Sequence, residues 1–149
     1  MQRINLGKAA PELYKTVLEL ENLSMQKVQQ AGLEIGFSHL LKLRASQINQ
    51  SAFCVRMHTQ DAMKAGESIE RIALISAWQE SGYFSEKERA ALILIEEITL
   101  IAQQHFPDSA YQETAKSLSD AEVAAIEWIA IVINTWNRIA ISSQYAVNP

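Results

Sequence analysis

The segment from Ser119 to about Tyr145 constrains the fold most strongly. It opens with Ser119-Asp-Ala-Glu122, which has the spacing of a capping box, where a hydroxyl and a carboxylate satisfy unpaired backbone N–H groups at a helix start. The residues from Val123 to Ile133 are apolar almost all round the predicted helix. Such a helix must be covered on two sides. We therefore expect its own domain to cover one side and a second subunit to cover the other.

Five further segments are predicted to be helical from their apolar spacing of three and four residues, and no segment shows the alternation of a strand. The last of them opens with a second capping box, Ser85-Glu-Lys-Glu88, and stops before Pro107, which cannot extend a helix. The predicted fold is an all-α helical bundle forming a single domain over residues 1–149. The five segments are 12–30, about 39–46, about 50–65, 69–78 and 86–104.

The composition bounds the function. The chain of 149 residues is 48% hydrophobic with a net charge of −4, which suits one soluble domain and argues against nucleic-acid binding, because that needs a basic face. A single cysteine excludes an internal disulfide framework. The most apolar window, Val123 to Ile133, is shorter than the roughly 20 residues of a membrane span. With no evident signal peptide, we expect a cytoplasmic protein.

The stretch from Arg44 to His58 carries the candidate chemistry. If it is helical, Ser51, Cys54 and His58 stand at i, i+3 and i+7 and share one face. A thiolate attacks peroxides far better than a thiol does. His58 can either accept the proton of Cys54 or stabilise its thiolate as an imidazolium.

This stretch resembles one branch of a known superfamily. The motifs that carry the resemblance are Leu43-Arg-Ala-Ser-Gln-Ile-Asn49, Ala52-Phe-Cys54 and Met57-His-Thr59, followed by Ala77–Ser81, Phe84–Leu92 and Ile133–Ile139. Together they closely resemble the alkylhydroperoxidase D (AhpD) branch of the carboxymuconolactone decarboxylase-like superfamily, over roughly residues 30 to 145.

The resemblance implies a fold, an assembly and an activity. AhpD-like proteins are trimers or hexamers of helical protomers, so a homo-oligomer is expected. In the family, the cysteine matching Cys54 is attacked by a hydroperoxide. A first cysteine, matching Ser51, resolves the product as a disulfide, and a dithiol partner such as a lipoyl domain reduces that disulfide.

Three positions depart from the family pattern. Ser51 stands in place of the first cysteine, Gln50 stands where glycine is usual, and His39 stands where a glutamate precedes that cysteine by about twelve residues. An engineered Cys-to-Ser exchange does not explain the other two departures, so we interpret all three as natural divergence. Because serine cannot form an S–S bond, the intramolecular half of the cycle is absent.

Two functions are weighed. The first is a one-cysteine hydroperoxide reductase. Cys54 is its nucleophile, His58 its base, Ser51 a hydrogen-bond donor to the thiolate and His39 a member of the relay, and an external thiol or dithiol is the reductant. The second is a divergent non-peroxidase scaffold that binds a small apolar ligand or a protein partner. Lactone decarboxylation is less favoured, because Arg138 is its one strongly matched cationic candidate.

No cofactor and no metal are expected. Cys54, His58 and His39 are possible ligands, but they lack the spacing of a zinc site. A carboxylate on a neighbouring helix could orient His58 through its second ring nitrogen. The candidates for that role are Glu88, Glu96 and Glu97. The aromatic Phe53 is expected to be core or to line the entrance to Cys54.

Overall fold

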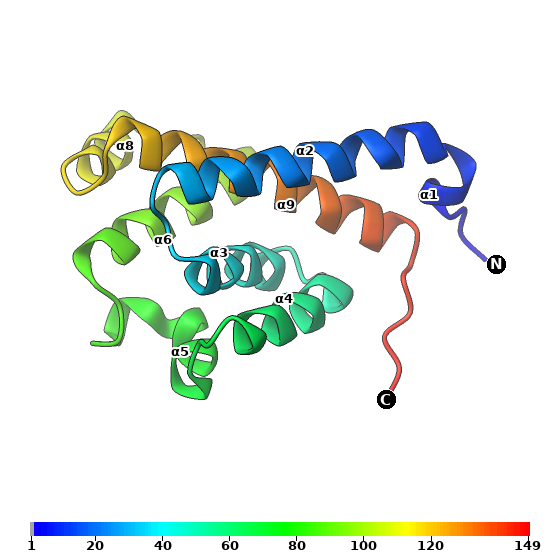
Figure 1. Ribbon diagram of the computed structural model, residues 1–149, viewed down its shortest axis with the longest axis horizontal. Helices are drawn as coiled ribbons and strands as arrows, with labels where there is room; N and C mark the ends of the chain where they lie inside the picture. The colour runs from blue at the N-terminus through cyan, green and yellow to red at the C-terminus, as the bar shows by residue number, and fades with distance from the viewer. Residues whose placement is uncertain (1) are drawn as a thin grey trace.

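Helix α9 (Asp120–Ser142) runs through the centre of the molecule and packs against α2, α3 and α6 (Figure 1). The capping box predicted at its start is present, because Ser119 and Glu122 each accept a hydrogen bond from the other's backbone N–H. On one side of α9, Trp128 and Ile131 remain 45% and 44% exposed. That surface is where a second subunit was expected, and the homo-oligomer stays a prediction.

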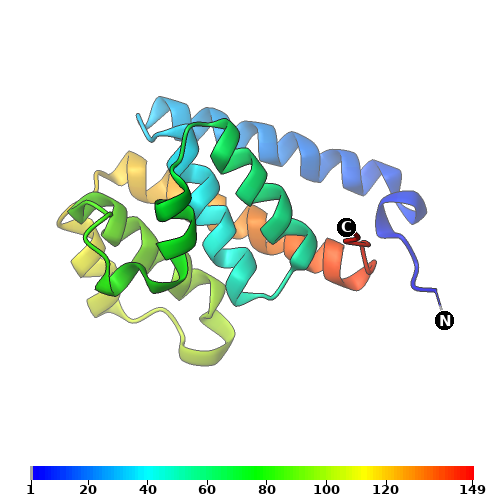
Figure 2. The ribbon, with the colours of Figure 1, turned by 90° about the horizontal axis from the view of Figure 1, so that it is seen from below.

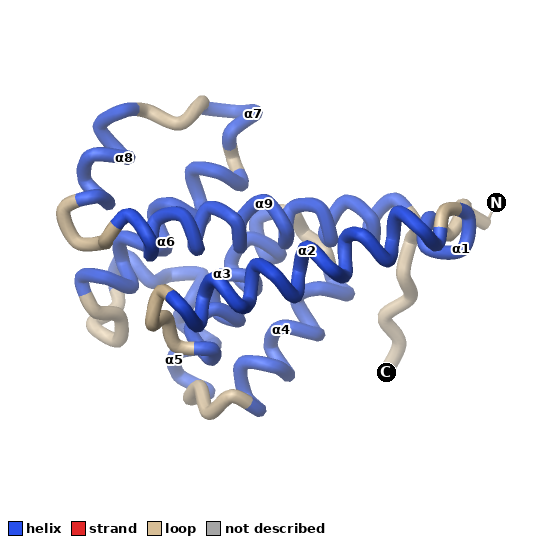
Figure 3. Tube along the Cα trace, turned by 45° about the horizontal axis from the view of Figure 1, so that its top comes forward, coloured by secondary structure: helices blue, strands red, loops and turns tan. Residues whose placement is uncertain are grey.

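The computed structural model describes residues 2–149, and within that range the chain contains helices and no strand (Figure 3). The all-α fold predicted from the sequence is confirmed. Within the same range, no helix combines the length and apolarity needed to cross a membrane. The remaining helices are α1 (Leu6–Ala9), α2 (Pro11–Gln30), α3 (Ile35–Ile48), α4 (Ala52–Lys64), α5 (Ile69–Leu74), the 3₁₀ helix η1 (Ile75–Glu80), α6 (Glu86–Thr99), α7 (Ile101–Gln104) and α8 (Asp108–Ala115).

Several parts of the helix prediction were wrong. The helix predicted over 86–104 is divided at Leu100 into α6 and α7. At that point the hydroxyl of Thr99 donates back to the carbonyl of Ile95, a bond that bends helices, and it also accepts from Asn134 of α9. Helices α1 and α8 were not predicted, and α8 contributes buried Thr114 to the packing.

Helices α3 and α4 lie side by side and hold the candidate chemistry (Figure 2). α3 begins at Ile35, so His39 lies in its second turn and not at its start as expected. The cap of α4 is Ser51, although its hydroxyl makes no capping bond. The predicted caps have other partners, since Ser46 donates to the carbonyl of Lys42, and Asn49 donates to two asparagines of α9.

The turn between α3 and α4 holds Gln50 in a left-handed conformation, with φ of 57°. A side chain with a Cβ is disfavoured there, whereas glycine adopts the conformation freely. We expect Gln50→Gly to raise the free energy of unfolding by about 0.5–1 kcal/mol, measured by urea denaturation. The same exchange at exposed Gln26, inside α2, should instead lower it by about 0.5 kcal/mol. If Gln50→Gly lowers the free energy of unfolding, the left-handed conformation of Gln50 does not strain the backbone.

Candidate functional site

A pocket of about 310 Å³ opens between α2, α3, α4 and α9. One part of its wall is apolar or aromatic and the other part carries the polar side chains. The apolar part comprises Tyr14, Leu18, Phe53, Met57, Trp136 and Ala140, and the polar part comprises Glu21, His39, Lys42, Cys54, His58 and Asp61.

Cys54 and His58 share this pocket. Cys54 lies in the first turn of α4 and is 1% exposed, and His58 follows one turn later with 5% exposure. Ser51 is also buried, but it precedes the helix and lines a different, shallow pocket beside Tyr145. The hydroxyl of Ser51 has no hydrogen-bond partner within residues 2–149. The structure therefore brings the sulfur and the imidazole to one cavity and leaves Ser51 outside its lining.

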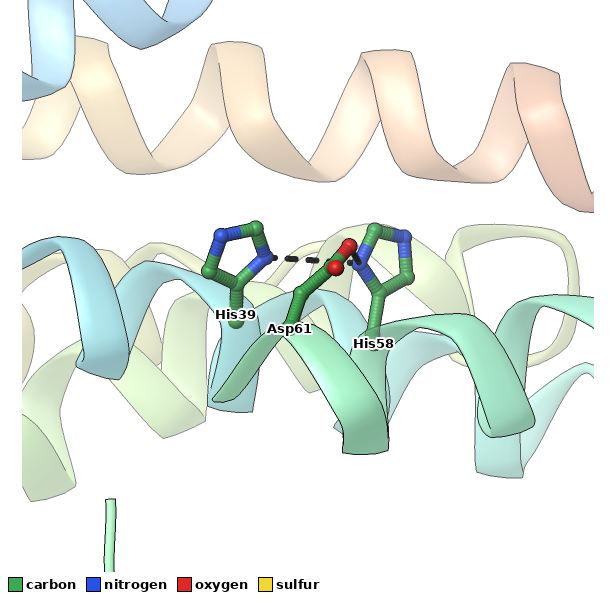
Figure 4. Close-up of side chains that lie close together, drawn as sticks. All are labelled: His39, His58 and Asp61. Carbon is green, nitrogen blue, oxygen red and sulfur yellow. Dashed lines mark hydrogen bonds and ion pairs between the residues drawn. The ribbon is translucent and has the colours of Figure 1, made fainter. Parts of the chain in front are cut away.

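His39 and Asp61 adjoin His58 (Figure 4). The Nδ1 atoms of the two histidines are 3.5 Å apart and their rings are stacked with centroids 5.7 Å apart. Oδ2 of Asp61 lies 3.9 Å from Nδ1 of His58. The position that the resemblance assigned to the relay is thus in contact with the imidazole.

None of the three glutamates considered from the sequence orients His58. Glu88 pairs with Arg71 at 2.6 Å and Glu96 pairs with Arg44 at 2.6 Å. Glu97 accepts a hydrogen bond from Gln104 at 3.1 Å. The neighbouring carboxylate is Asp61, which the sequence reading missed. Its i+3 spacing from His58 on one helix was the available signal.

Lys42 is the second missed residue, and it is 1% exposed. Its ammonium forms an ion pair with Glu21 of α2 and contacts the sulfur of Met25 at 3.1 Å. The other carboxylate oxygen of Glu21 accepts a hydrogen bond from Nε1 of Trp136 at 3.2 Å. This buried charge pair therefore connects α2, α3 and α9 at the wall of the pocket.

The surroundings keep both imidazoles neutral. Burial, followed by the ammonium of Lys42 and the ring of His39, lowers the pKa of His58 to about 3. Burial, followed by Lys42, also lowers the pKa of His39, against the opposing effect of Asp61. Of the two roles expected for His58, the structure favours a neutral proton acceptor over a resident imidazolium.

Comparison with known proteins identifies the family of this chain. Residues 11–97 match the carboxymuconolactone decarboxylase family. The chain belongs to this family. It is 37% identical over 141 residues, 95% of this chain and 93% of the other, to the uncharacterized protein YdfG of Bacillus subtilis strain 168.

A solved structure is also similar to this chain. This is ATU0492 of Agrobacterium tumefaciens, a protein of unknown function provisionally named antioxidant defence protein AhpD. It superposes with a TM-score of 0.88 at 43% identity, covering 100% of this chain and 99% of the other. The AhpD-like resemblance drawn from the sequence is confirmed.

In the present chain, Arg138 lies on the surface of α9. It donates to the carbonyl and side-chain oxygens of Asn134 in its own helix and does not line the pocket. Asn134 and Asn137 bridge helices, since both accept hydrogen bonds from Asn49. The lactone reading therefore has no support from Arg138 at this cavity.

Proposed function

We propose that this protein reduces hydroperoxides with apolar substituents, using Cys54 as its only reactive sulfur. The observation that carries the proposal is that Cys54 and His58 line one cavity of about 310 Å³ whose other wall is largely apolar. A cavity of this size and lining suits a small organic hydroperoxide. The provisional antioxidant name of the Agrobacterium relative agrees with this role.

The first half of the cycle is an attack of sulfur on oxygen. The sulfur of Cys54 attacks the terminal peroxide oxygen, the O–O bond breaks, and Cys54 becomes a sulfenic acid. His58 accepts the thiol proton as the S–O bond forms and returns it to the departing alkoxide, which leaves as an alcohol. We assign Nε2 as the accepting atom, which is buried and makes no hydrogen bond within residues 2–149, either to Cys54 or to another residue.

His39 is a positioning residue in this scheme. For Nε2 of His58 to accept a proton, the ring must carry its own proton on Nδ1. That N–H faces Nδ1 of His39 at 3.5 Å, which can accept it. His39 thereby takes over, from the glutamate usual in the family, the task of fixing the tautomer of His58.

The second half of the cycle requires an external reductant. With no second cysteine in the chain, one external thiol attacks the sulfenic sulfur and releases water, giving a mixed disulfide. A second thiol, or the second sulfur of a dithiol, then displaces Cys54 as a thiol. Each hydroperoxide consumed therefore oxidises two external thiol groups to one disulfide.

The proposal is tested by following cumene hydroperoxide consumption with dithiothreitol as reductant. Wild-type protein should turn over the peroxide, and Cys54→Ala should fall to the rate of the uncatalysed reaction, because no other sulfur nucleophile of this kind remains. Dimedone should label Cys54 after one equivalent of peroxide, detected by mass spectrometry. A wild-type rate equal to that of Cys54→Ala would overturn the proposal.

A second candidate function is binding of a small apolar ligand without chemistry. The aromatic wall formed by Tyr14, Phe53 and Trp136, together with the absent resolving cysteine, favours it. Under this alternative, Cys54 reacts slowly with iodoacetamide at neutral pH, and an apolar fluorescent probe binds the pocket equally well in wild type and Cys54→Ala. Rapid alkylation with peroxide turnover excludes it.

A further inference from the structure

Three side chains with metal-binding atoms converge at the pocket that Cys54 also lines (Figure 4). His39 comes from α3, and His58 and Asp61 come from neighbouring turns of α4. Their ligand atoms all lie within 4.8 Å of one another. We propose that His39, His58 and Asp61 bind a divalent transition-metal ion, for which Zn²⁺ is the best match.

The spacing of the ligand atoms fits such an ion. Bonds of about 2.0–2.2 Å in a tetrahedral arrangement place neighbouring ligand atoms roughly 3.3 Å apart. The two imidazole nitrogens are 3.5 Å apart, close to this value already. The carboxylate of Asp61 is farther out, at 3.9 Å, but this side chain is 33% exposed and can rotate inward.

The types of ligand atom also fit. Two imidazole nitrogens and one carboxylate oxygen are ligands that zinc takes in sites with an open fourth position. All three residues line the cavity, so a water molecule or a small anionic ligand in the cavity can complete the coordination. A hydrogen bond between the two imidazoles would account for the histidines alone, because the 3.9 Å between Nδ1 of His58 and Oδ2 of Asp61 is longer than a hydrogen bond. A bound metal ion would account for the position of all three side chains.

The charges around His39, His58 and Asp61 are compatible with a bound cation. Lys42 is a buried positive charge that acts on both histidines, and the carboxylate of Glu21 offsets part of it. Lys64 lies 3.8 Å from the other oxygen of Asp61, but it is 76% exposed and can move into solvent. The carboxylate of Asp61 is then free to balance part of the charge of the ion.

Metal binding also changes what His58 offers to Cys54. In Figure 4, Nε2 of His58 points away from Asp61, toward the N-terminal end of α4, where Cys54 lies. With an ion on Nδ1, the neutral ring carries its proton on Nε2, so this atom donates and no longer accepts. The metal-bound form therefore lacks the proton acceptor of the peroxide reaction. The inference goes beyond the proposed function, and either can fail alone.

The test uses metal-free full-length protein in thiol-free buffer, titrated with Zn²⁺ by calorimetry and with Co²⁺ by visible absorption. We expect one ion per chain and the intense visible bands of four-coordinate cobalt. His39→Ala and Asp61→Asn should each weaken Zn²⁺ binding by more than the roughly 10–100-fold that loss of a mere supporting partner causes. Circular dichroism confirms that each variant is folded.

Matched variants separate this site from the sulfur chemistry. Exposed His105 lies in another part of the chain, so His105→Ala should leave Zn²⁺ binding unchanged. Cys54→Ala should also keep its Zn²⁺ affinity while losing peroxide turnover. The inference is overturned if no saturable binding occurs, if binding survives in the His39→Ala/Asp61→Asn double variant, or if a sulfur-to-cobalt charge-transfer band shows that Cys54 is a ligand.

Discussion

Replacing Glu21 with leucine should lower the free energy of unfolding by about 2–3 kcal/mol, because it leaves the ammonium of Lys42 buried without a counter-charge. Lys42 is 1% exposed, and the carboxylate of Glu21 is its ion-pair partner. The cost stays below the 3–5 kcal/mol typical of fully buried pairs, since the side chain of Glu21 is 22% exposed. Urea unfolding followed by circular dichroism measures the change.

Replacing Lys42 as well should restore the free energy of unfolding that Glu21→Leu loses. Lys42→Met keeps a similar shape without a charge, so Glu21→Leu/Lys42→Met should recover most of the stability. Glu19→Leu, at an exposed position of α2, is the matched control and should change stability by at most about 0.5 kcal/mol. If Glu21→Leu behaves like Glu19→Leu, Lys42 does not depend on this carboxylate.

The helix starts were predictable where their determinants are local. Ser85 and Ser119 each lie three residues before a glutamate, and both form the capping boxes expected of that spacing. The end of α6 was not predictable in the same way. Thr99 is bonded to Asn134, which is distant in the sequence, and only the packing of α6 against α9 brings the two together.

The candidate site was predictable only in part, for the same reason. Cys54 and His58 belong to one helix, so their spacing alone places them on one face. Lys42 was missed because it sits within the apolar run Leu40-Leu41-Lys-Leu43, which reads as core. Its charge is tolerated there because Glu21 reaches it from α2. The carboxylate near His58 was sought on neighbouring helices, whereas Asp61 lies one turn along the same one.

The exchange Ser51→Cys should raise peroxide turnover with a dithiol reductant by roughly tenfold or more, because an intramolecular thiol three residues before the sulfenic acid reacts as if at very high concentration. The new thiol would condense with the sulfenic acid of Cys54 to give a disulfide and water, and the dithiol would then reduce that disulfide. Steady-state consumption of cumene hydroperoxide with dihydrolipoamide measures the gain.

The exchange Ser51→Cys should leave the local hydrogen bonds of Ser51 intact. The hydroxyl of Ser51 has no hydrogen-bond partner within residues 2–149, so a thiol in its place breaks no contact. The backbone N–H of Ser51 keeps its bond to the carbonyl of Ser46 at 3.0 Å whatever the side chain is. Ser51→Ala is the control and should show no gain. If Ser51→Cys also shows none, turnover is limited not by the missing resolving cysteine but by His39 or by the pocket.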